Sequence, residues 1–205
     1  MRQTRPTQER KTPFTKKLIY LAVILAVIGA FVLLITGGWK SLGKALLTPS
    51  YKVNVAAADV DTAQATWQAR AVSSYRIVVV QGQPRLRGAA YEVTVRNGQI
   101  TAGRRALLNP PWTPEQAKSL PAEAWESLAK GPPLARLEPY TVTGLFDAAR
   151  QTIARGPFEG RCNTEATIAF DPDWGFPIKI EYAWDTNCER NSPELWVVVE
   201  FVSLR

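Results

Sequence analysis

The chain has 205 residues, of which 46% are hydrophobic and 21% charged, a composition that excludes a disordered protein. Its formal net charge is +7, but residues 1–17 hold six basic residues against one acidic residue and supply +5 of that charge. Because the rest of the chain is close to neutral, its composition does not favour a phosphate-gripping surface, and we predict no nucleic-acid partner.

Residues 18–36, LIYLAVILAVIGAFVLLIT, carry no charge. At a helical rise of ~1.5 Å per residue they span roughly the hydrocarbon thickness of a bilayer. The basic excess of residues 1–17 predicts that this tail is cytoplasmic, that 18–36 is a transmembrane helix, and that the rest of this single-pass cell-membrane protein lies outside. A cleaved signal peptide is the alternative, but the apolar run is too long and lacks a cleavage site directly after it.

The remaining chain is interpreted as a juxtamembrane linker, residues 37–56, and one extracytoplasmic domain, residues 57–205. Part of the linker is either plain connecting chain or a short helix at the lipid headgroups. Residues 59–70 predict a helix, and 75–80 predict a strand. A hairpin follows, because Asn97-Gly98 is a two-residue turn signal between strands at 91–96 and 99–101.

Residues 104–139 are rich in proline, and helix-forming stretches lie between the prolines. The first helix is expected to begin at Thr113-Pro114. Residues 141–155 have apolar residues on one helical face and end at Gly156-Pro157. The apolar run at 195–204 predicts a central strand.

A second hairpin is expected between these last two elements. Residues 166–170 and 178–184 alternate as half-buried strands do, and a turn-rich segment separates them. If the turn is centred on Gly175, Phe170 lies opposite Ile180 and Ile168 lies opposite Tyr182. The same register brings Cys162 opposite Cys188.

These two cysteines are the only ones in the chain, and an oxidising compartment favours a disulfide between them. A redox-active pair is the alternative, but no C-x-x-C motif supports it. Together the elements predict an α+β domain: an antiparallel sheet of about five to six strands with helices grouped on one side, preceded by the transmembrane helix.

Four segments resemble an uncharacterised bacterial envelope family of lipoproteins and membrane-anchored proteins, a domain of unknown function. The resemblance rests on Trp67 with Tyr75, VTVRNG at 93–98, TVTGLFD at 141–147 and FDPDWGFPIKI at 170–180. Phe170 and Phe176 stand where tyrosine is expected, and a helix replaces the lipid-modified cysteine. The resemblance implies an envelope location and this architecture, and it implies no activity, ligand or catalytic residue.

The chain contains no histidine, which removes the commonest general base and transition-metal ligand. No glycine-rich phosphate loop is present. We therefore predict a protein that is not an enzyme and has no cofactor. Asp171 and Asp173, with Asp147, are weak candidates for a Ca²⁺ site, although aspartates in such a segment more often form turns.

Trp112 and Trp174 lie in loops, and together with Phe176 they are the candidate contact surface. The alternative is that Trp174 packs back over the edge of the domain. The leading hypothesis is a non-enzymatic protein-interaction or envelope-assembly module with a protein partner. The second hypothesis is a binder of a small ligand or of cell-wall material through loop aromatics.

Overall fold

The computed structural model describes residues 49–128, 132–157, 162–184 and 193–204. The chain divides into two compact units, Met1–Thr48 and Pro49–Arg205, and all the described residues belong to the second. Everything below concerns that unit.

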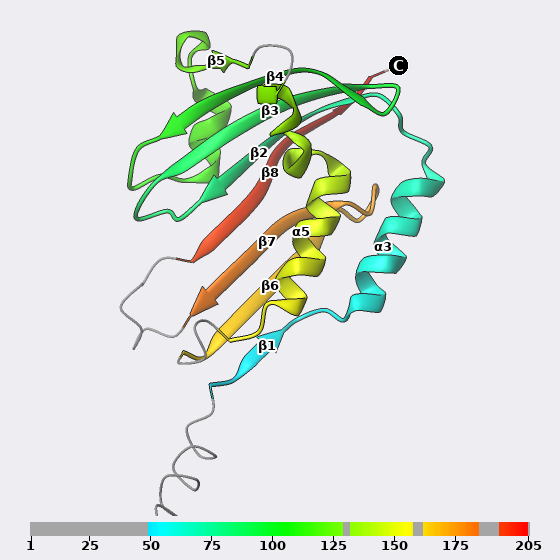
Figure 1. Ribbon diagram of the computed structural model, residues 1–205, viewed down its shortest axis with the longest axis vertical. Coiled ribbons are helices and arrows are strands. Elements are labelled where there is room, and N and C mark those ends of the chain that lie inside the picture. The colour runs from blue at the N-terminus through cyan, green and yellow to red at the C-terminus, as the bar shows by residue number, and fades with distance from the viewer. Residues whose placement is uncertain (1–48, 129–131, 158–161, 185–192, 205) are drawn as a thin grey trace, which may run out of the picture. The chain divides into compact units, whose positions relative to one another are not determined.

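One sheet of eight strands, in the order β1-β6-β7-β8-β2-β3-β4-β5, forms the frame of the unit (Figure 1). Neighbouring strands are antiparallel except β1 and β6, which are parallel. The strands are β1 (Tyr51–Val53), β2 (Tyr75–Gly82), β3 (Gly88–Arg96), β4 (Gln99–Leu108), β5 (Glu126–Ser127), β6 (Thr164–Phe170), β7 (Pro177–Trp184) and β8 (Glu194–Ser203).

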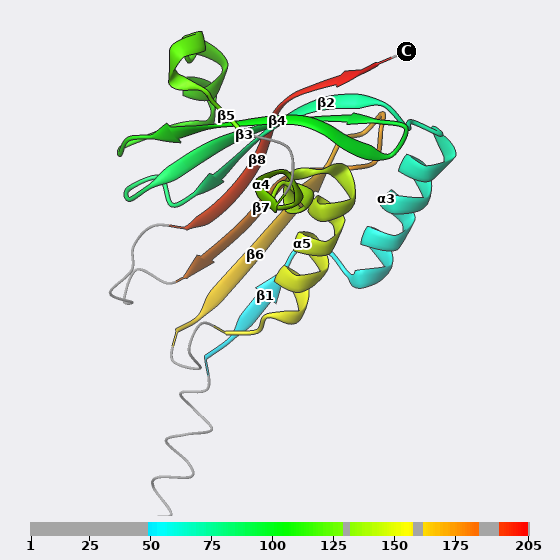
Figure 2. The same ribbon diagram turned by 45° about the horizontal axis from the view of Figure 1, so that its top comes forward.

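Two long helices lie on one face of the sheet, which we call the inner face (Figures 1 and 2). Helix α5 packs on β6 and β7, and α3 packs beside α5. Shorter helices complete the chain. The helices are α3 (Ala57–Ala69), η1 (Pro114–Ser119), η2 (Ala122–Ala124), α4 (Pro132–Ala135), η3 (Glu138–Tyr140) and α5 (Val142–Ala154).

The predicted antiparallel sheet of five to six strands is wrong: the described residues are mostly sheet, with eight strands and one parallel pair. The two strands that sequence patterns miss are β1 and β5, of three and two residues. Strands this short show no alternation of apolar and polar residues, so only their pairing partners define them.

Several local predictions are confirmed. The helix predicted at 141–155 is α5, and Thr141 caps it by accepting a hydrogen bond from the Gly144 amide at 3.1 Å. Asn97 and Gly98 form the β3–β4 turn with φ angles of 51° and 75°, which an Asn-Gly pair tolerates. Strand β8 is central, between β7 and β2. In 104–139, by contrast, β4 runs on to Leu108 and most of the predicted helix is short 3₁₀ turns.

The β6–β7 hairpin is confirmed, but its predicted register is wrong by two residues. Ile168 lies opposite Ile180, and not opposite Tyr182, which pairs with Ala166. The reason is a tight turn, in which the Gly175 amide donates to the Asp171 carbonyl at 2.9 Å. A shift of two residues keeps each side chain on its predicted face, because the side-chain period of a strand is two.

Strand β4 contains a bulge at Thr101. Thr94 and Val95 are consecutive on β3, yet they pair with Ala102 and Ile100, so Thr101 is the extra residue. Before the bulge Ile100 points to the inner face with Val95, and after it the odd-numbered residues do so. The bulge therefore reverses which residues of β4 face the helices.

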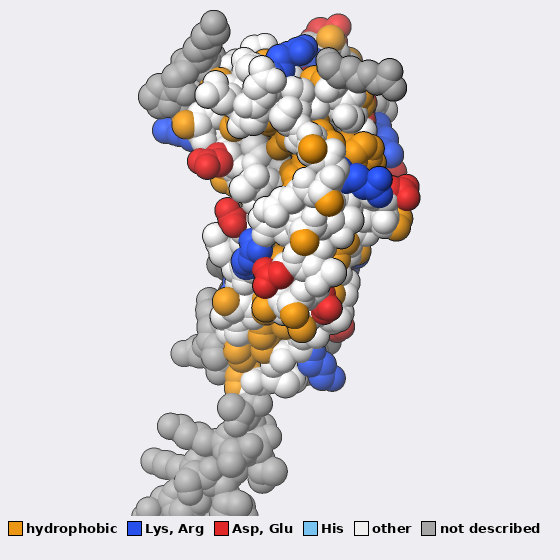
Figure 3. Space-filling model, turned by 90° about the vertical axis from the view of Figure 1, so that its right-hand side faces the viewer, with side chains coloured by type: hydrophobic (Ala, Val, Ile, Leu, Met, Phe, Trp, Pro, Cys, Tyr) orange, Lys and Arg blue, Asp and Glu red, His pale blue; other side chains and the backbone are white. Residues whose placement is uncertain are grey.

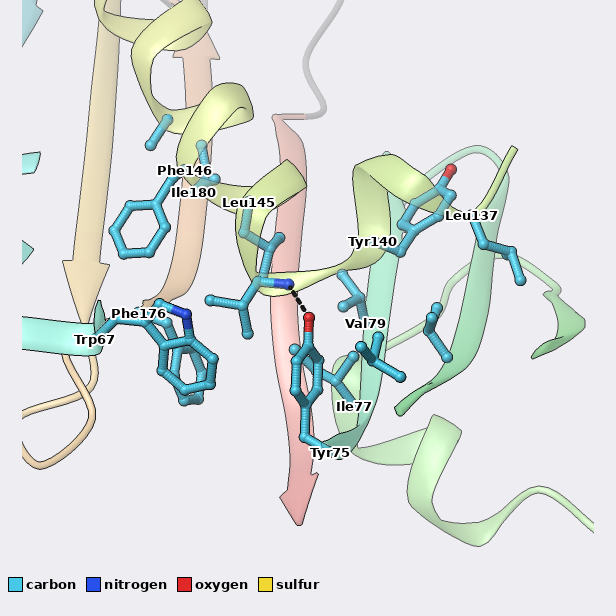
Figure 4. Close-up of a cluster of buried hydrophobic side chains, with 14 of the residues drawn as sticks. Trp67, Tyr75, Ile77, Val79, Leu137, Tyr140, Leu145, Phe146, Phe176 and Ile180 are labelled. Atoms are coloured by element: carbon cyan, nitrogen blue, oxygen red, sulfur yellow. Dashed lines mark hydrogen bonds between the residues drawn. The ribbon is translucent and has the colours of Figure 1, made fainter. Parts of the chain in front are cut away.

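The main core lies between the inner face and the helices (Figure 4). Trp67 of α3 meets Phe176 edge to face, with ring centroids 5.7 Å apart. The Tyr75 hydroxyl accepts a hydrogen bond from the Val142 amide at 3.2 Å, which ties β2 to the start of α5. Burial raises the pKa of Tyr75, so this hydroxyl stays protonated.

The predicted boundary between linker and domain, 56/57, is also corrected. The compact unit starts at Pro49, and β1 pairs with Thr164 to Ala166 of β6. Beyond β1, the Asn54 side chain takes the place of a further strand residue. Its amide donates to the Ile168 carbonyl at 2.9 Å, and its Oδ1 accepts from the Ile168 amide at 2.8 Å.

The predicted transmembrane helix, 18–36, lies outside the described residues. Within the described ranges, no helix combines the length and the apolar character needed to cross a membrane. The predicted single-pass arrangement, with the domain placed outside the cytoplasm, is therefore not borne out by the described part of the chain.

Candidate functional site

Two of the three aromatics predicted to form a contact surface are buried. Trp112 is 2% exposed, because its ring packs on Gly88 and its indole donates to the Gln83 carbonyl at 3.1 Å. Phe176 is 1% exposed and belongs to the main core. The prediction is wrong for both, since neither side chain presents a surface to a partner.

Trp174 is half-buried at the β6–β7 turn. Its ring lies 6.5 Å from that of Trp67 and 5.4 Å from that of Phe201, measured between centroids. The Arg70 guanidinium covers it at 6.0 Å. Trp174 thus packs back over the edge of the domain, the alternative that the sequence left open.

The predicted calcium candidates belong to this same turn. Oδ1 of Asp171 accepts from the amides of Asp173 and Trp174, each at 2.9 Å. Asp147 lies elsewhere, on α5, with Arg150 at 3.7 Å. Among the described residues, no three His, Cys, Asp or Glu side chains group closely enough to hold a metal ion. Asp171 acts as a turn former.

Cys162 is disulfide-bonded and has no free thiol. Its predicted partner, Cys188, lies outside the described residues, so the pairing itself stays a prediction.

The side of the unit that carries α3 has no patch on which the described charged side chains are all basic or all acidic. Figure 3 shows basic and acidic side chains interspersed on this side. Arg150 of α5, for example, is paired with Asp61 of α3 at 2.9 Å. The candidate site lies instead at the β2–β3–β4 end of the sheet.

Two stacked tyrosine rings form the floor of this site, and a tryptophan ring packs against one of them. Tyr140 of η3 stacks on Tyr91 of β3, with centroids 3.7 Å apart and planes 12° from parallel. Tyr140 also stacks on Trp196 of β8 at 5.4 Å. The Tyr140 hydroxyl donates to Oε1 of Gln81 at 2.8 Å. The floor is therefore fixed by three strands and by η3.

Tyr140 keeps its proton at neutral pH. Burial, followed by the neighbouring Tyr91 hydroxyl, raises the pKa of Tyr140 well above its ordinary range. The Tyr140 hydroxyl is thus neutral, and it adds no negative charge that would repel an anion.

Adjacent arginines of β4 point to opposite faces of the sheet. Arg104 lies on the outer face, where its guanidinium holds Glu92 at 2.8 and 2.9 Å, and Arg76 holds the same carboxylate at 3.0 Å. Arg105 lies on the inner face, opposite Tyr91. Arg105 is half-buried, yet it forms no ion pair with any described carboxylate.

A hollow of about 290 Å³ opens beside Arg105. Arg136, which is exposed and likewise without an ion pair in the described chain, also lines it. The hollow is lined by Tyr91, Arg105, Leu128, Arg136, Leu137 and Tyr140. Two arginines and two tyrosines thus line one small cavity.

Gly103 explains how the wall that carries Arg136 reaches the sheet. A Cβ on Gly103 would lie 1.9 Å from Cδ1 of Leu137, so only glycine lets this buried leucine press on β4. The close approach sets the distance between the wall and the strand.

A second hollow, a groove of about 680 Å³, lies where β2 ends and β3 begins. Its surface is mainly apolar. The groove is lined by Gln81, Gly82, Gln83, Arg85, Leu86, Arg87, Pro110 and Glu194. Its one acidic residue, Glu194, is bound to the Arg155 guanidinium at 2.7 Å.

Comparison of the chain with protein-family models, curated proteins and solved structures gives no match. The envelope-family resemblance therefore stays a prediction, and the site is interpreted from its own geometry.

Sequence reasoning missed this site because it ended β4 at residue 101. Its signal was present in Arg104-Arg105, since consecutive residues of a strand point to opposite faces. The pair therefore places one guanidinium on each face of the sheet.

Proposed function

We propose that the protein is a non-enzymatic binding module that holds a small organic oxyanion, a carboxylate or a phosphate, between Arg105 and Arg136. The observation that carries the proposal is that two arginines without described carboxylate partners line one hollow. Arg104, the neighbour of Arg105, by contrast forms an ion pair with the carboxylate of Glu92.

The chemistry of the hollow fits this ligand class. A guanidinium presents its N–H donors as a planar fork that matches two oxygens of a carboxylate or phosphate. Half-burial of Arg105 reduces the screening of its charge by water. A volume of about 290 Å³ suits a small group and is too small for a large cofactor.

Titration of the protein with glutarate and with glycerol phosphate tests the proposal and separates the two anion types. We expect Arg105→Ala and Arg136→Ala each to weaken binding about tenfold or more, since a charge-assisted hydrogen bond contributes about 1.5–3 kcal/mol. Glu126→Gln should strengthen binding, because Glu126 is the cross-strand neighbour of Arg105.

Arg96→Ala is the matched control. Arg96 is an exposed arginine at the other end of β3, and it also forms no ion pair with a described residue. Its removal lowers the net charge equally but should leave the affinity unchanged. Equal weakening by all three substitutions would reduce the effect to general electrostatics and refute a specific site.

A further inference from the structure

One hydrogen bond links the lining of the groove to the lining of the hollow. Gln81 lines the groove and Tyr140 lines the hollow, and the Tyr140 hydroxyl donates to the Gln81 side chain at 2.8 Å. The two hollows therefore lie near each other on the unit.

Exposed apolar side chains gather at the same end of the sheet. Among the residues that the structure describes, Leu107 and Leu86 are the most exposed large apolar side chains, at 67% and 54%. Leu86 lines the groove. Leu107 follows Arg105 by two positions on β4 and therefore lies on the inner face beside it, about 7 Å away.

Basic residues outnumber acidic ones on this surface, where Glu126, the cross-strand neighbour of Arg105, is an acidic exception. Arg87 on the groove is exposed and has no ion pair among the described carboxylates, as is the case for Arg105 and Arg136 in the hollow. Glu194 is neutralised by Arg155. The surface thus combines unpaired cationic groups with exposed leucines, which complements an acidic and apolar partner.

We infer, on the basis of the proposed function, that the natural ligand is an extended peptide segment of a partner protein that carries an acidic and an apolar side chain two positions apart. In an extended chain, residues i and i+2 point the same way and lie about 7 Å apart. That spacing matches Arg105 and Leu107. The carboxylate enters the hollow, and the apolar side chain covers Leu107 towards the groove.

Capped pentapeptides of equal composition test the spacing. Acetyl-Gly-Glu-Gly-Leu-Gly-amide and its Leu-first reversal place both side chains on one face, whereas acetyl-Gly-Gly-Glu-Leu-Gly-amide places them on opposite faces. Titration of the full chain, followed by NMR, should show that one of the spaced peptides binds about tenfold more tightly than the adjacent one, the effect of burying much of one leucine side chain.

Two variants assign the difference to the surface. Leu107→Ser should abolish the advantage of the spaced peptide and leave the affinity for glutarate unchanged. Val202→Ser is the matched control, because Val202 is an exposed apolar residue on β8, near the opposite end of the sheet. It should leave both affinities unchanged.

The possible failures are distinguishable. If glutarate binds but spaced and adjacent peptides bind equally, or no peptide binds, the inference is overturned and the proposed function stands. If neither glutarate nor glycerol phosphate binds, the proposed function fails, and the inference that rests on it fails with it.

Discussion

At the scale of single residues, the environment of each side chain decides its role more than its type does. Arg104 and Arg105 are adjacent arginines, yet Arg104 forms an ion pair with Glu92, whereas Arg105 lines the hollow together with Arg136. Tyr140 likewise differs from an ordinary surface tyrosine, because burial and the neighbouring Tyr91 hydroxyl raise its pKa, and its protonated hydroxyl donates to Gln81.

Tyr140→Phe tests this environment through its pH dependence. The raised pKa of Tyr140 means that the unfolded chain loses the proton first, so the stability it gives is full below pH about 10 and is lost as the pH rises further. Phenylalanine cannot ionise, so the variant should lose less stability between about pH 9 and 11 in urea denaturation. Near neutrality it should be about 1 kcal/mol less stable, since the bond to Gln81 is gone.

Some of the alkaline decline should remain in that variant. Burial also raises the pKa of Tyr51 and Tyr75, and these two groups are untouched. An alkaline decline identical to that of the original protein would show that Tyr140 is not held in its neutral form.

At the scale of elements, those defined by local signals could be predicted from the sequence. The Asn97-Gly98 turn and the helix that Thr141 caps need only their own residues, and both were found. Strand β4 could not be followed, because the bulge at Thr101 breaks the alternation that identifies a strand. The candidate site was missed for the same reason, since Arg105 lies beyond the bulge.

Gly103→Ala tests how η3 and its neighbours are seated on β4. The added methyl group would collide with Leu137, which is 1% exposed and cannot move into solvent. We expect a loss of about 1–3 kcal/mol in the free energy of unfolding, measured by chemical denaturation, and weaker anion binding as Arg136 moves away.

Ala102→Ser is the control for that substitution. Ala102 precedes Gly103 on the same strand and is exposed, so a slightly larger side chain meets no obstacle. If both variants were as stable as the original protein, the packing of Leu137 on Gly103 would not position the wall of the hollow.

At the scale of the whole unit, contacts between distant segments decide the outcome. Strand β1 pairs with β6, which lies more than a hundred residues further along the chain. The Ser50 carbonyl accepts from the Thr164 amide at 2.9 Å, and the Asn54 side chain bonds to both the amide and the carbonyl of Ile168. No local pattern encodes such a pairing, which is why the sequence assigned these residues to a linker. Trp112 was misjudged for a related reason, because a loop position does not reveal what folds over it.

Two chains with different starting points test this boundary. A chain that begins at Pro49 keeps β1, whereas one that begins at residue 57 exposes the edge of β6. We expect the shorter chain to be roughly 2–4 kcal/mol less stable in urea denaturation, from lost hydrogen bonds and from apolar area exposed around Tyr51. If the two chains were equally stable, residues 49–56 would contribute nothing to the fold and would belong to the linker, as the sequence predicted.

The extra residue at Thr101 also bears on how the gene can change by insertion and deletion. Loss of Thr101 would remove the bulge and leave Arg104 paired with Glu92 and Arg105 paired with Tyr91, because the remaining residues of β4 would then alternate regularly. Each arginine would keep its face of the sheet. In descendants of this chain, loss of one residue at this position should therefore coincide with retained binding, whereas gain of one residue should exchange the two faces unless a second bulge absorbs it.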